Sequence, residues 1–215
     1  MAVRAVIFDF GGVLCFHPSE DRFARIANLF GISTQELLNI FWANRIDYDA
    51  GLVDSRTYWT QIAQAAGRPP AAPGMDAGLL RTLVEYEIQL WNNYDQRILS
   101  WAAYLRSSGF RTAILSNLPS ALGEALRATP GFLDPFDHVT FSYELKLVKP
   151  QAAIYLDAIR GVGVPPAEAL FLDDKAENVE GALAVGLQSE LYSTWEAFRA
   201  EAGERYNLPM LLQSP

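Results

Sequence analysis

Two kinds of segment alternate along this chain, and their alternation limits the folds open to it. Short apolar runs rich in Val, Ile and Phe end in polar residues, and segments of helical spacing separate these runs from about residue 96 onward. Continuous apolar runs of this length are typical of parallel strands covered on both faces. The alternation therefore predicts an α/β fold built from βα units. The strands that we expect are residues 3–9, 111–117, 138–142, 169–174 and 187–192.

The stretch from Phe16 to Asp95 breaks this alternation, because it contains no convincing strand. Helical spacing of apolar residues follows Ser19, Thr34 and Ser55, each of which is a residue type that commonly begins a helix. A fourth helical segment follows a connector rich in Pro, Ala and Gly at residues 68–78. Four helices are too many for an ordinary crossover between two strands, so they predict a helical insertion.

The expected organisation is thus one core interrupted by one insertion. We predict a Rossmann-like, doubly wound parallel sheet made by residues 1–15 and 96–215, with the four-helix insertion at residues 16–95. The chain has 215 residues, of which 50% are hydrophobic, and that is enough to bury an apolar core. The oligomeric state expected is a monomer or a homodimer.

The charge and the single cysteine exclude several classes of protein. Seventeen basic and 25 acidic residues give a net charge of -8, and an acidic surface repels nucleic-acid backbones. Cys15 alone permits neither an internal disulfide nor a zinc cluster, which fits a reducing compartment. The first apolar run is too short for a signal peptide, and no run is long enough to span a membrane. We expect a soluble, cytoplasmic protein that binds neither nucleic acid nor membrane.

Polar side chains gather where the expected strands end. Ligands bind at the carboxyl ends of the strands in a doubly wound sheet, so these side chains should meet at one edge. Each has an ordinary alternative, such as an Asp-Gly turn, a helix N-cap or a surface lysine. Together, however, a carboxylate, a hydroxyl, a lysine and an acidic pair suit Mg²⁺-assisted phosphoryl transfer through an aspartyl-phosphate. These residues are Asp9, Ser116, Asn117, Lys149, Asp173 and Asp174.

The order of these motifs resembles that of the haloacid dehalogenase-like hydrolase superfamily. The similarity is to the branch in which a helical cap is inserted after the first motif, and it covers nearly the whole chain. The motifs that carry the resemblance are residues 8–14, 115–117, 149–155 and 171–186. The resemblance implies that the helical insertion is a cap that selects the substrate.

The resemblance also implies a catalytic pair and a metal site. Asp9 would be the nucleophile that becomes phosphorylated, and Lys149 would neutralise the nucleophile and the transferring group. Mg²⁺ would be held by Asp9, Asp173, Asp174 and the backbone carbonyl of Gly11. Mg²⁺ prefers a few carboxylates together with carbonyl and water oxygens, which such a set can supply.

The substrate phosphoryl group would be held by hydroxyl and amide donors. The resemblance assigns this role to Ser116 and to the backbone amide of Asn117. The amides of Phe10 and Gly11 can add a nest for the transferring oxygens. The substrate implied is a small phosphorylated metabolite, with sugar phosphates as one class.

Gly11 departs from the pattern of the family. Most phosphatases of the superfamily carry a second aspartate there, which protonates the leaving group and then activates water. The function that we predict is a Mg²⁺-dependent phosphatase, but the departure keeps two alternatives open. One is a 2-haloacid dehalogenase, in which Asp9 attacks carbon, and the other is a member without catalytic activity.

The cap sequence offers weaker candidates. A loop expected over residues 45–51 can reach the site, yet we favour a solvated helix-end role for Arg45 over anion binding. Asp47 and Asp49 resemble turn carboxylates more than ligands of sugar hydroxyls. His17 reads as a plain loop histidine, although it is placed to supply the proton that Gly11 cannot. His138 reads as structural, and three tryptophans read as cap core rather than as a sugar platform; these are Trp42, Trp59 and Trp91.

Overall fold

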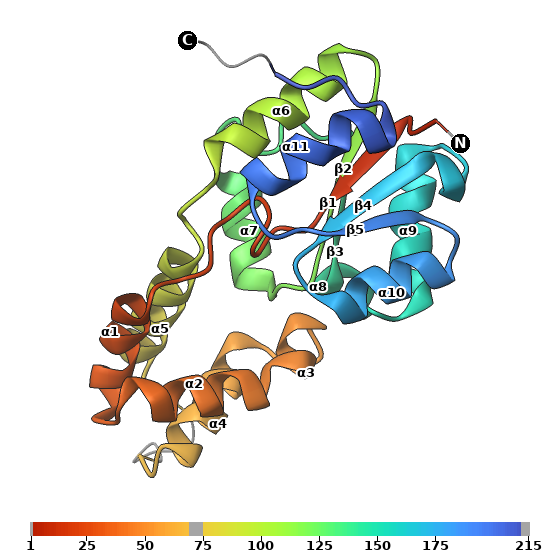
Figure 1. Ribbon diagram of the computed structural model, residues 1–215. Coiled ribbons are helices and arrows are strands. Elements are labelled where there is room, and N and C mark those ends of the chain that lie inside the picture. Colours follow the sequence, from red (N-terminus) through yellow and green to blue (C-terminus); the bar gives the residue numbers. More distant parts are fainter. Residues whose placement is uncertain (1, 69–74, 212–215) are drawn as a thin grey trace.

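The core of the protein is a five-stranded parallel sheet, shown in Figure 1. The computed structural model describes residues 2–68 and 75–211. The strand order is β3-β2-β1-β4-β5, which confirms the doubly wound α/β fold. The strands are β1 (Ala5–Phe8), β2 (Arg111–Ser116), β3 (His138–Phe141), β4 (Ala169–Asp173) and β5 (Gln188–Leu191).

The register of the central strand brings the ends of its neighbours together. Phe8, the last residue of β1, pairs with Ile114 of β2 and with Leu172 of β4. The residues that follow these positions therefore leave the sheet at one edge. Asp9 is the first of them, and Ser116 and Asp173 stand beside it on the flanking strands.

Helices cover both faces of the sheet, as continuous apolar strands require. Val6 and Phe8 face a layer that contains Trp101, whose ring centroid lies 5.7 Å from that of Phe8. Ala5 and Ile7 face the opposite layer. The first layer holds α6 (Gln96–Ser107), α7 (Ser120–Ala128) and α11 (Trp195–Tyr206), and the second holds α9 (Ala152–Val162) and α10 (Ala176–Ala184).

Two short elements complete the core. The helix α8 (Ser142–Leu145) follows β3, and a 3₁₀ turn, Pro166–Glu168, precedes β4. His138, at the start of β3, lies 3.3 Å from a carboxylate oxygen of Asp157, in keeping with the structural role expected for it. None of the helices in residues 2–68 and 75–211 is long and apolar enough to cross a membrane.

Within residues 16–68 and 75–95, the insertion is helical but contains one more helix than we expected. Among the described residues, α3 (Arg45–Asp49) occupies the segment predicted as a loop. The side chains at its two ends form an ion pair of 2.7 Å between Arg45 Nε and Asp49 Oδ1, which closes a single turn. The other helices are α1 (Glu20–Phe30), α2 (Thr34–Ala43), α4 (Ser55–Ala65) and α5 (Ala77–Leu90). Most of the Pro/Ala/Gly-rich connector, residues 69–74, lies outside the described residues.

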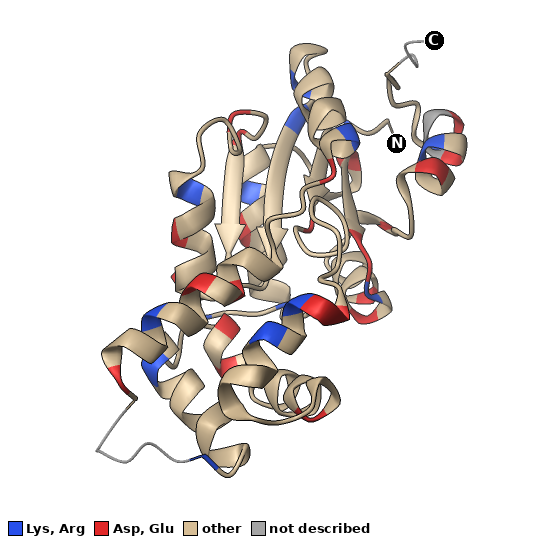
Figure 2. Cartoon of the chain, turned by 90° about the vertical axis from the view of Figure 1, so that its left-hand side faces the viewer, with Lys and Arg blue, Asp and Glu red and all other residues tan. Residues whose placement is uncertain are grey.

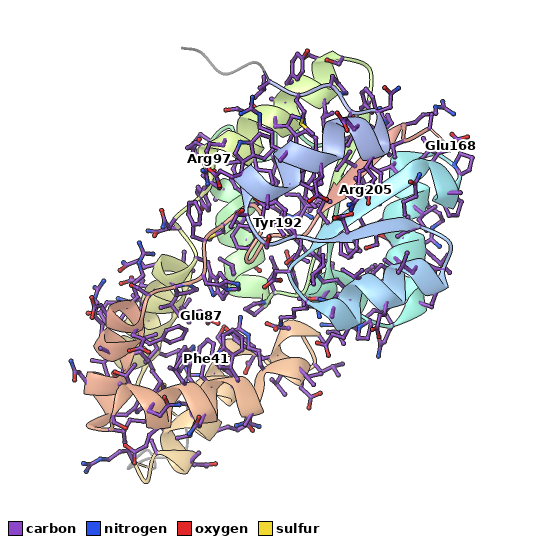
Figure 3. The ribbon with its side chains drawn as sticks, in the orientation of Figure 1. Phe41, Glu87, Arg97, Glu168, Tyr192 and Arg205 are labelled. Atoms are coloured by element: carbon purple, nitrogen blue, oxygen red, sulfur yellow. The ribbon has the colours of Figure 1, made fainter. Side chains whose placement is uncertain are left out.

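The helical unit has its own aromatic interior. Phe41, Tyr58 and Trp59 are fully buried, so the expectation that Trp59 is cap core is confirmed. The stacked rings of Tyr48 and Tyr58 lie 4.1 Å apart. Figure 3 shows Phe41 and Glu87 among the helices of this unit. A packed interior of this kind gives the insertion a stable surface to present to the core.

The two connections between the units run side by side. Cys15 and Tyr94 form an antiparallel bridge, Phe16 N–H donates to Asn93 O at 2.9 Å, and Asp95 N–H donates to the Leu14 carbonyl at 2.9 Å. The sequence gives no sign of this pairing, because the partners are about 80 residues apart. The insertion is therefore attached through a paired ribbon.

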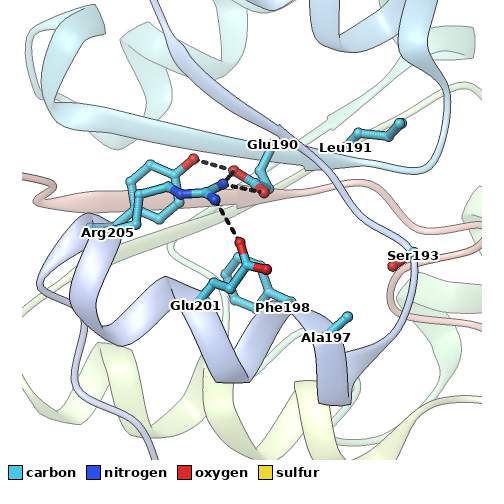
Figure 4. A pocket seen from close by; sticks show the side chains of 8 residues that line it. Glu190, Leu191, Ser193, Ala197, Phe198, Glu201 and Arg205 are labelled. Carbon is cyan, nitrogen blue, oxygen red and sulfur yellow. Dashed lines mark hydrogen bonds and ion pairs between the residues drawn. The ribbon is translucent and has the colours of Figure 1, made fainter.

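A small cavity of about 220 Å³ lies between β5 and α11, and the residues that line it follow the last motif in the chain (Figure 4). Arg205 Nη1 lies 2.7 Å from Glu190, and Arg205 Nη2 lies 2.6 Å from Glu201. Tyr206 also donates its hydroxyl to Glu190. These polar groups bind one another, so the cluster serves to hold α11 against the edge strand.

Candidate active site

The expected site residues meet at the carboxyl edge of the sheet, beneath the helical unit. They line a cavity of about 700 Å³ between the sheet edge and helices α2 and α3. Asp173 is fully buried and lies under this surface. The predicted residues that line the cavity are Asp9, Phe10, Gly11, Ser116, Asn117, Lys149 and Asp174.

Lys149 joins two of the carboxylates. Its Nζ lies 2.8 Å from Asp9 Oδ1 and 2.6 Å from Asp173 Oδ2, and its side chain is 1% exposed. Burial by itself lowers the pKa of Lys149, but the charges of Asp9 and Asp173 outweigh it and raise that pKa above its usual value. The lysine is therefore held as a cation next to the expected nucleophile.

The pKa of Asp9 is also raised, but for a carboxyl group a raised pKa favours the neutral form. Burial raises the pKa of Asp9 to about 7, with the charge of Lys149 opposing and that of Asp173 adding to the rise. Oδ1 accepts both the Lys149 ammonium and the Phe10 backbone N–H, the latter at 2.7 Å. The second oxygen is thus the one turned to other partners. A bound cation at this point would favour the ionised, nucleophilic form.

Three carboxylates come close enough to share a metal ion. Asp9, Asp173 and Asp174 each place a ligand oxygen within 4.8 Å of the others. Asp174 Oδ2 lies 3.0 Å from His17 Nε2, whereas Asp174 Oδ1 is buried without a hydrogen-bond partner among the described residues. A buried carboxylate oxygen without a partner is costly, and a cation would satisfy it. The residues present therefore fit Mg²⁺.

Asp173 is bound differently from its neighbour. Its Oδ1 accepts the Lys175 backbone N–H and the Asn178 side-chain amide, each at 2.9 Å, and its Oδ2 accepts Lys149. Both oxygens are thus engaged by nitrogen donors. Asp173 positions Lys149 and the start of α10, which the adjacency of two acidic residues in the sequence does not reveal.

The expected phosphate donors are only partly available. Asn117 binds the Lys149 backbone twice, accepting its N–H at 2.8 Å and donating to its carbonyl at 3.1 Å, so its side chain braces the lysine. The Phe10 N–H donates to Asp9, which removes it from the nest that we expected. Ser116, 3% exposed, lines the cavity as predicted, as does Gly11.

The structure explains what stands at Gly11 in place of an acid. A Cβ atom on Gly11 would lie 3.0 Å from Cζ3 of Trp91, so the indole fills the space that a longer side chain would need. The left-handed backbone belongs to Gly12, with φ of 80°. Trp91 was expected in the cap core, yet it also lines the cavity. No sequence signal linked Gly11 to a residue 80 positions away.

His17 approaches the metal-ligand set rather than standing alone in a loop. Its ring lies 6.5 Å from that of Trp91, and its side chain is 62% exposed. The hydrogen bond to Asp174 raises the pKa of His17 above its usual value, against the opposing effect of burial. The sequence placed His17 near the first motif but could not show its partner, which is 157 residues away.

Arg45 and Trp42 of the cap are placed differently from what we expected. Arg45 is buried rather than solvated, and its Nη1 lies 2.6 Å from Glu87 in addition to its ion pair with Asp49. Burial raises the pKa of Asp49 to about 6, with the charge of Arg45 opposing. Trp42 is 45% exposed and lines the cavity, so it is not cap core. Glu87 had no distinguishing signal in the sequence, because it resembles any polar residue in the middle of a helix.

Comparisons with known proteins agree with this geometry. The sequence model of haloacid dehalogenase-like hydrolases matches residues 3–186. The chain is 27% identical over 189 residues to the sesquiterpene phosphatase astK of Aspergillus oryzae, covering 86% of this chain and 87% of that protein.

Solved structures show the same fold. One is an HAD family enzyme of Bacteroides thetaiotaomicron in complex with magnesium and inorganic phosphate, with a TM-score of 0.70, 19% identity, and coverage of 91% of this chain and 98% of that chain. Another is the L-2-haloacid dehalogenase of Xanthobacter autotrophicus with covalently bound chloropropionic acid, with a TM-score of 0.66, 22% identity, and coverage of 96% and 85%. With its motifs gathered at one sheet edge and the family model matching most of its length, this chain belongs to the haloacid dehalogenase-like hydrolases.

Proposed function

We propose that the protein is a Mg²⁺-dependent phosphatase that hydrolyses a small phosphate monoester through an aspartyl-phosphate. The observation that carries the proposal is the position of Lys149, whose Nζ bridges Asp9 and Asp173. Beside it, Asp174 Oδ1 has no hydrogen-bond partner within residues 2–68 and 75–211. A phosphoryl group and a carboxylate are both anionic, so their approach needs fixed positive charge. This site supplies one buried cation and a place for a second.

The residues then have distinct roles. Asp9 attacks phosphorus, the bond from phosphorus to the ester oxygen breaks, and the alcohol leaves with a proton from solvent, since Gly11 provides none. Water next attacks the phosphorus of the aspartyl-phosphate, which releases inorganic phosphate and restores the Asp9 carboxylate. Lys149 and Ser116 hold phosphoryl oxygens. Asp9, Asp174 and the Gly11 carbonyl would hold Mg²⁺, with Asp173 behind them, and the ion would supply positive charge to the phosphoryl group.

The comparisons support this proposal in two ways. The relative from Aspergillus oryzae is named a phosphatase, and the enzyme from Bacteroides thetaiotaomicron was crystallised with magnesium and phosphate. Dehalogenation is the second candidate, because of the likeness to the Xanthobacter enzyme and the absence of an acid at Gly11. In that reaction Asp9 would attack carbon, and the acidic pair at Asp173 and Asp174 would have no metal to bind.

We also propose the division of labour along the chain. Residues 1–15 and 96–215 would form the catalytic core, and residues 16–95 the cap that selects the substrate. The partner is a small phosphorylated molecule rather than a nucleic acid, in keeping with the acidic and basic positions that are interleaved in Figure 2. The free, buried Cys15 supports a cytoplasmic location.

The experiment compares two activities with and without metal. We expect phosphate release from p-nitrophenyl phosphate that EDTA abolishes and Mg²⁺ restores, and no chloride release from 2-chloropropionate. Asp9→Asn should lose phosphate release by at least about 10³-fold, because an amide cannot form the acyl phosphate. Asp21→Asn, on the exposed side of α1, is the matched control.

Each alternative predicts a different result. Chloride release that survives EDTA would favour the dehalogenase, and the absence of both activities would favour a member without catalysis. Wild-type-like turnover by Asp9→Asn would end the aspartyl-phosphate mechanism. Beryllofluoride with Mg²⁺ should raise the Tm of the wild type by binding its folded state.

A further inference from the structure

The cap contributes an apolar wall to the active-site cavity. Trp42 at the end of α2 and Ile46 in α3 both line it, and they are 45% and 70% exposed. Leu122, which is only 2% exposed, and the half-buried Val148 of the core line the same cavity. Large apolar side chains exposed around a concave site are typical of a surface that a ligand covers.

The polar side chains near this wall are already bound to one another. Arg45 is paired with Asp49 and Glu87, and Asn117 is bound to the Lys149 backbone. A polyhydroxylated leaving group would have to compete with these bonds for the same side chains, so its hydroxyl groups would be poorly paired there. The wall therefore disfavours a sugar.

The remaining polar residues of the cavity belong to the phosphate side. Lys175 and Glu177 follow the acidic pair directly and are exposed. Gln151, next to Lys149 and Pro150, accepts the Val148 backbone N–H through its side chain at 3.2 Å. These three residues belong to the core, whereas His17, in the segment 16–95, lines the cavity where it binds Asp174. The end of the cavity at Trp42 and Ile46 thus differs in chemistry from the end at the acidic residues.

The wall is held in place by the buried network behind it. The Trp42 ring packs edge-on against Phe41, with centroids 5.0 Å apart, and the Arg45 guanidinium lies 5.9 Å from the Trp42 ring. Arg45 is in turn fixed by Glu87, which is fully buried. Because these side chains are already held in place, little conformational entropy is lost when a substrate binds against them.

We infer that the substrate is the monophosphate of an alcohol with a hydrocarbon chain, and that this chain lies against Trp42, Ile46, Leu122 and Val148. The inference rests on the proposed phosphatase activity. The phosphoryl group would occupy the polar end at Asp9 and Lys149. The hydrocarbon next to the ester oxygen would then displace water from the apolar end, which is favourable in proportion to the apolar area covered.

The first test is a chain-length series. The kcat/KM for butyl, hexyl and octyl phosphate, each below its micellar concentration, is compared with that for glycerol 3-phosphate and glucose 6-phosphate. All five esters leave from a primary alcohol, so the leaving group is matched and the carbon skeleton is what differs. We expect kcat/KM to rise by about twofold to fourfold for each methylene until the wall is covered, and to exceed that of both polyols.

The second test alters the wall. Ile46→Asn should lower the ratio of kcat/KM for octyl phosphate to that for glycerol 3-phosphate by about tenfold. Leu52→Asn is the matched control. Leu52 lies six residues after Ile46 and is similarly exposed, at 63%, but it does not line this cavity. Trp42→Ala should lower the same ratio, and Tm measurements verify that the variants remain folded.

The outcomes separate this inference from the proposed function. If the wild type releases no phosphate from p-nitrophenyl phosphate, the phosphatase proposal fails. If it does, but prefers glycerol 3-phosphate or glucose 6-phosphate to octyl phosphate, the phosphatase proposal stands and the hydrocarbon substrate is overturned. Equal ratios for Ile46→Asn and Leu52→Asn would likewise overturn the role of the wall.

Discussion

Adjacent aspartates do unequal work in this site. Asp173 has both oxygens bound by nitrogen donors, whereas Asp174 keeps one buried oxygen without a partner among the described residues. Asp173 therefore positions Lys149 and the start of α10, whereas Asp174 has an oxygen available for the expected cation. Their adjacency in the sequence predicts a shared role, and the hydrogen bonds divide it.

We expect Asp174→Asn to weaken Mg²⁺ binding by at least about tenfold with little change in Tm. Asp173→Asn should instead lower the Tm, because Lys149 loses one of its two buried carboxylate partners. Calorimetric Mg²⁺ titration and thermal unfolding of both variants measure the two effects. Indistinguishable Mg²⁺ titrations would show that this division is wrong.

Gly11 and Trp91 form a second pair whose members constrain each other. We expect Gly11→Asp alone to be a poor acid, because its Cβ would meet the indole at 3.0 Å. Combined with Trp91→Leu, it should speed hydrolysis of alkyl phosphates more than that of p-nitrophenyl phosphate, whose leaving group needs little protonation. General acid catalysis is worth about 10²–10⁴-fold, which sets the upper limit.

Initial rates on both substrates for the two single variants and the double variant measure this preference. A folded double variant that changes both substrates by one factor would show that the proton comes from elsewhere. His17, 3.0 Å from Asp174, would then be the next residue to replace.

At the residue scale, the sequence predicted the site residues at the ends of strands. It did not predict the roles of residues whose partners lie far away in the chain. Asp9, Ser116 and Asp174 could be found because parallel strands end at one edge. Glu87 and Trp91 could not, because their partners lie tens of residues away and helical spacing alone does not show which face meets the site. Arg45 was misjudged for the same reason.

At the scale of the elements, the N-cap residue of helix α6, Asp95, also forms an ion pair. Asp95 accepts the Arg97 backbone N–H at 3.0 Å, and its Oδ2 lies 2.6 Å from Arg97 Nη2. Burial alone would raise the pKa of Asp95, but the bonds from Arg97 outweigh it and hold that pKa below its usual value. The folded protein therefore binds this proton less readily than the unfolded chain does.

This pKa gives a pH-dependent contribution to stability. It is present above the ordinary aspartate pKa of about 4 and is lost as the pH falls through the lower folded value. We expect Asp95→Asn to lower the Tm by about 2–4 °C at pH 7 and by less at pH 3. Asparagine can still accept the N-cap hydrogen bond of α6 but carries no charge to pair with Arg97. A Tm difference that does not shrink on acidification would contradict this assignment.

Helix prediction worked where apolar spacing was long and failed where the helix was short. The spacing located α1, α2, α4 and α5, although Ser33 and Asp54, rather than Thr34 and Ser55, are the residues that cap α2 and α4. The segment from Arg45 to Gly51 is rich in turn-forming residues, so it resembled a loop. Its helical turn depends on burial of Arg45 and Tyr48, which local sequence does not encode.

At the scale of the whole molecule, the helical insertion also contacts the core beside α8. Ser142 Oγ, at the start of α8, donates to the Asp49 carbonyl, and Lys146 donates to the Gly51 carbonyl. We expect Lys146→Met to speed amide hydrogen exchange in residues 50–53 and to leave the strands of the core unchanged. Exchange as slow as in the wild type would show that the contact does not hold the cap.

The matched control for this variant is Arg81→Met. Arg81 lies exposed on α5, so its loss removes a positive charge from the cap without touching α8. Exchange in residues 50–53 of this control should follow that of the wild type.

The paired ribbon between the units restricts the mechanics of the molecule. Two independent tethers would let the cap translate, tilt and twist, whereas the bridge between Cys15 and Tyr94 locks the tethers into one strip. Such a strip flexes most easily about a single axis across its width. We therefore expect the helical unit to move chiefly about that one axis, so that Trp42 and Ile46 would return to the same place beside the site after each opening.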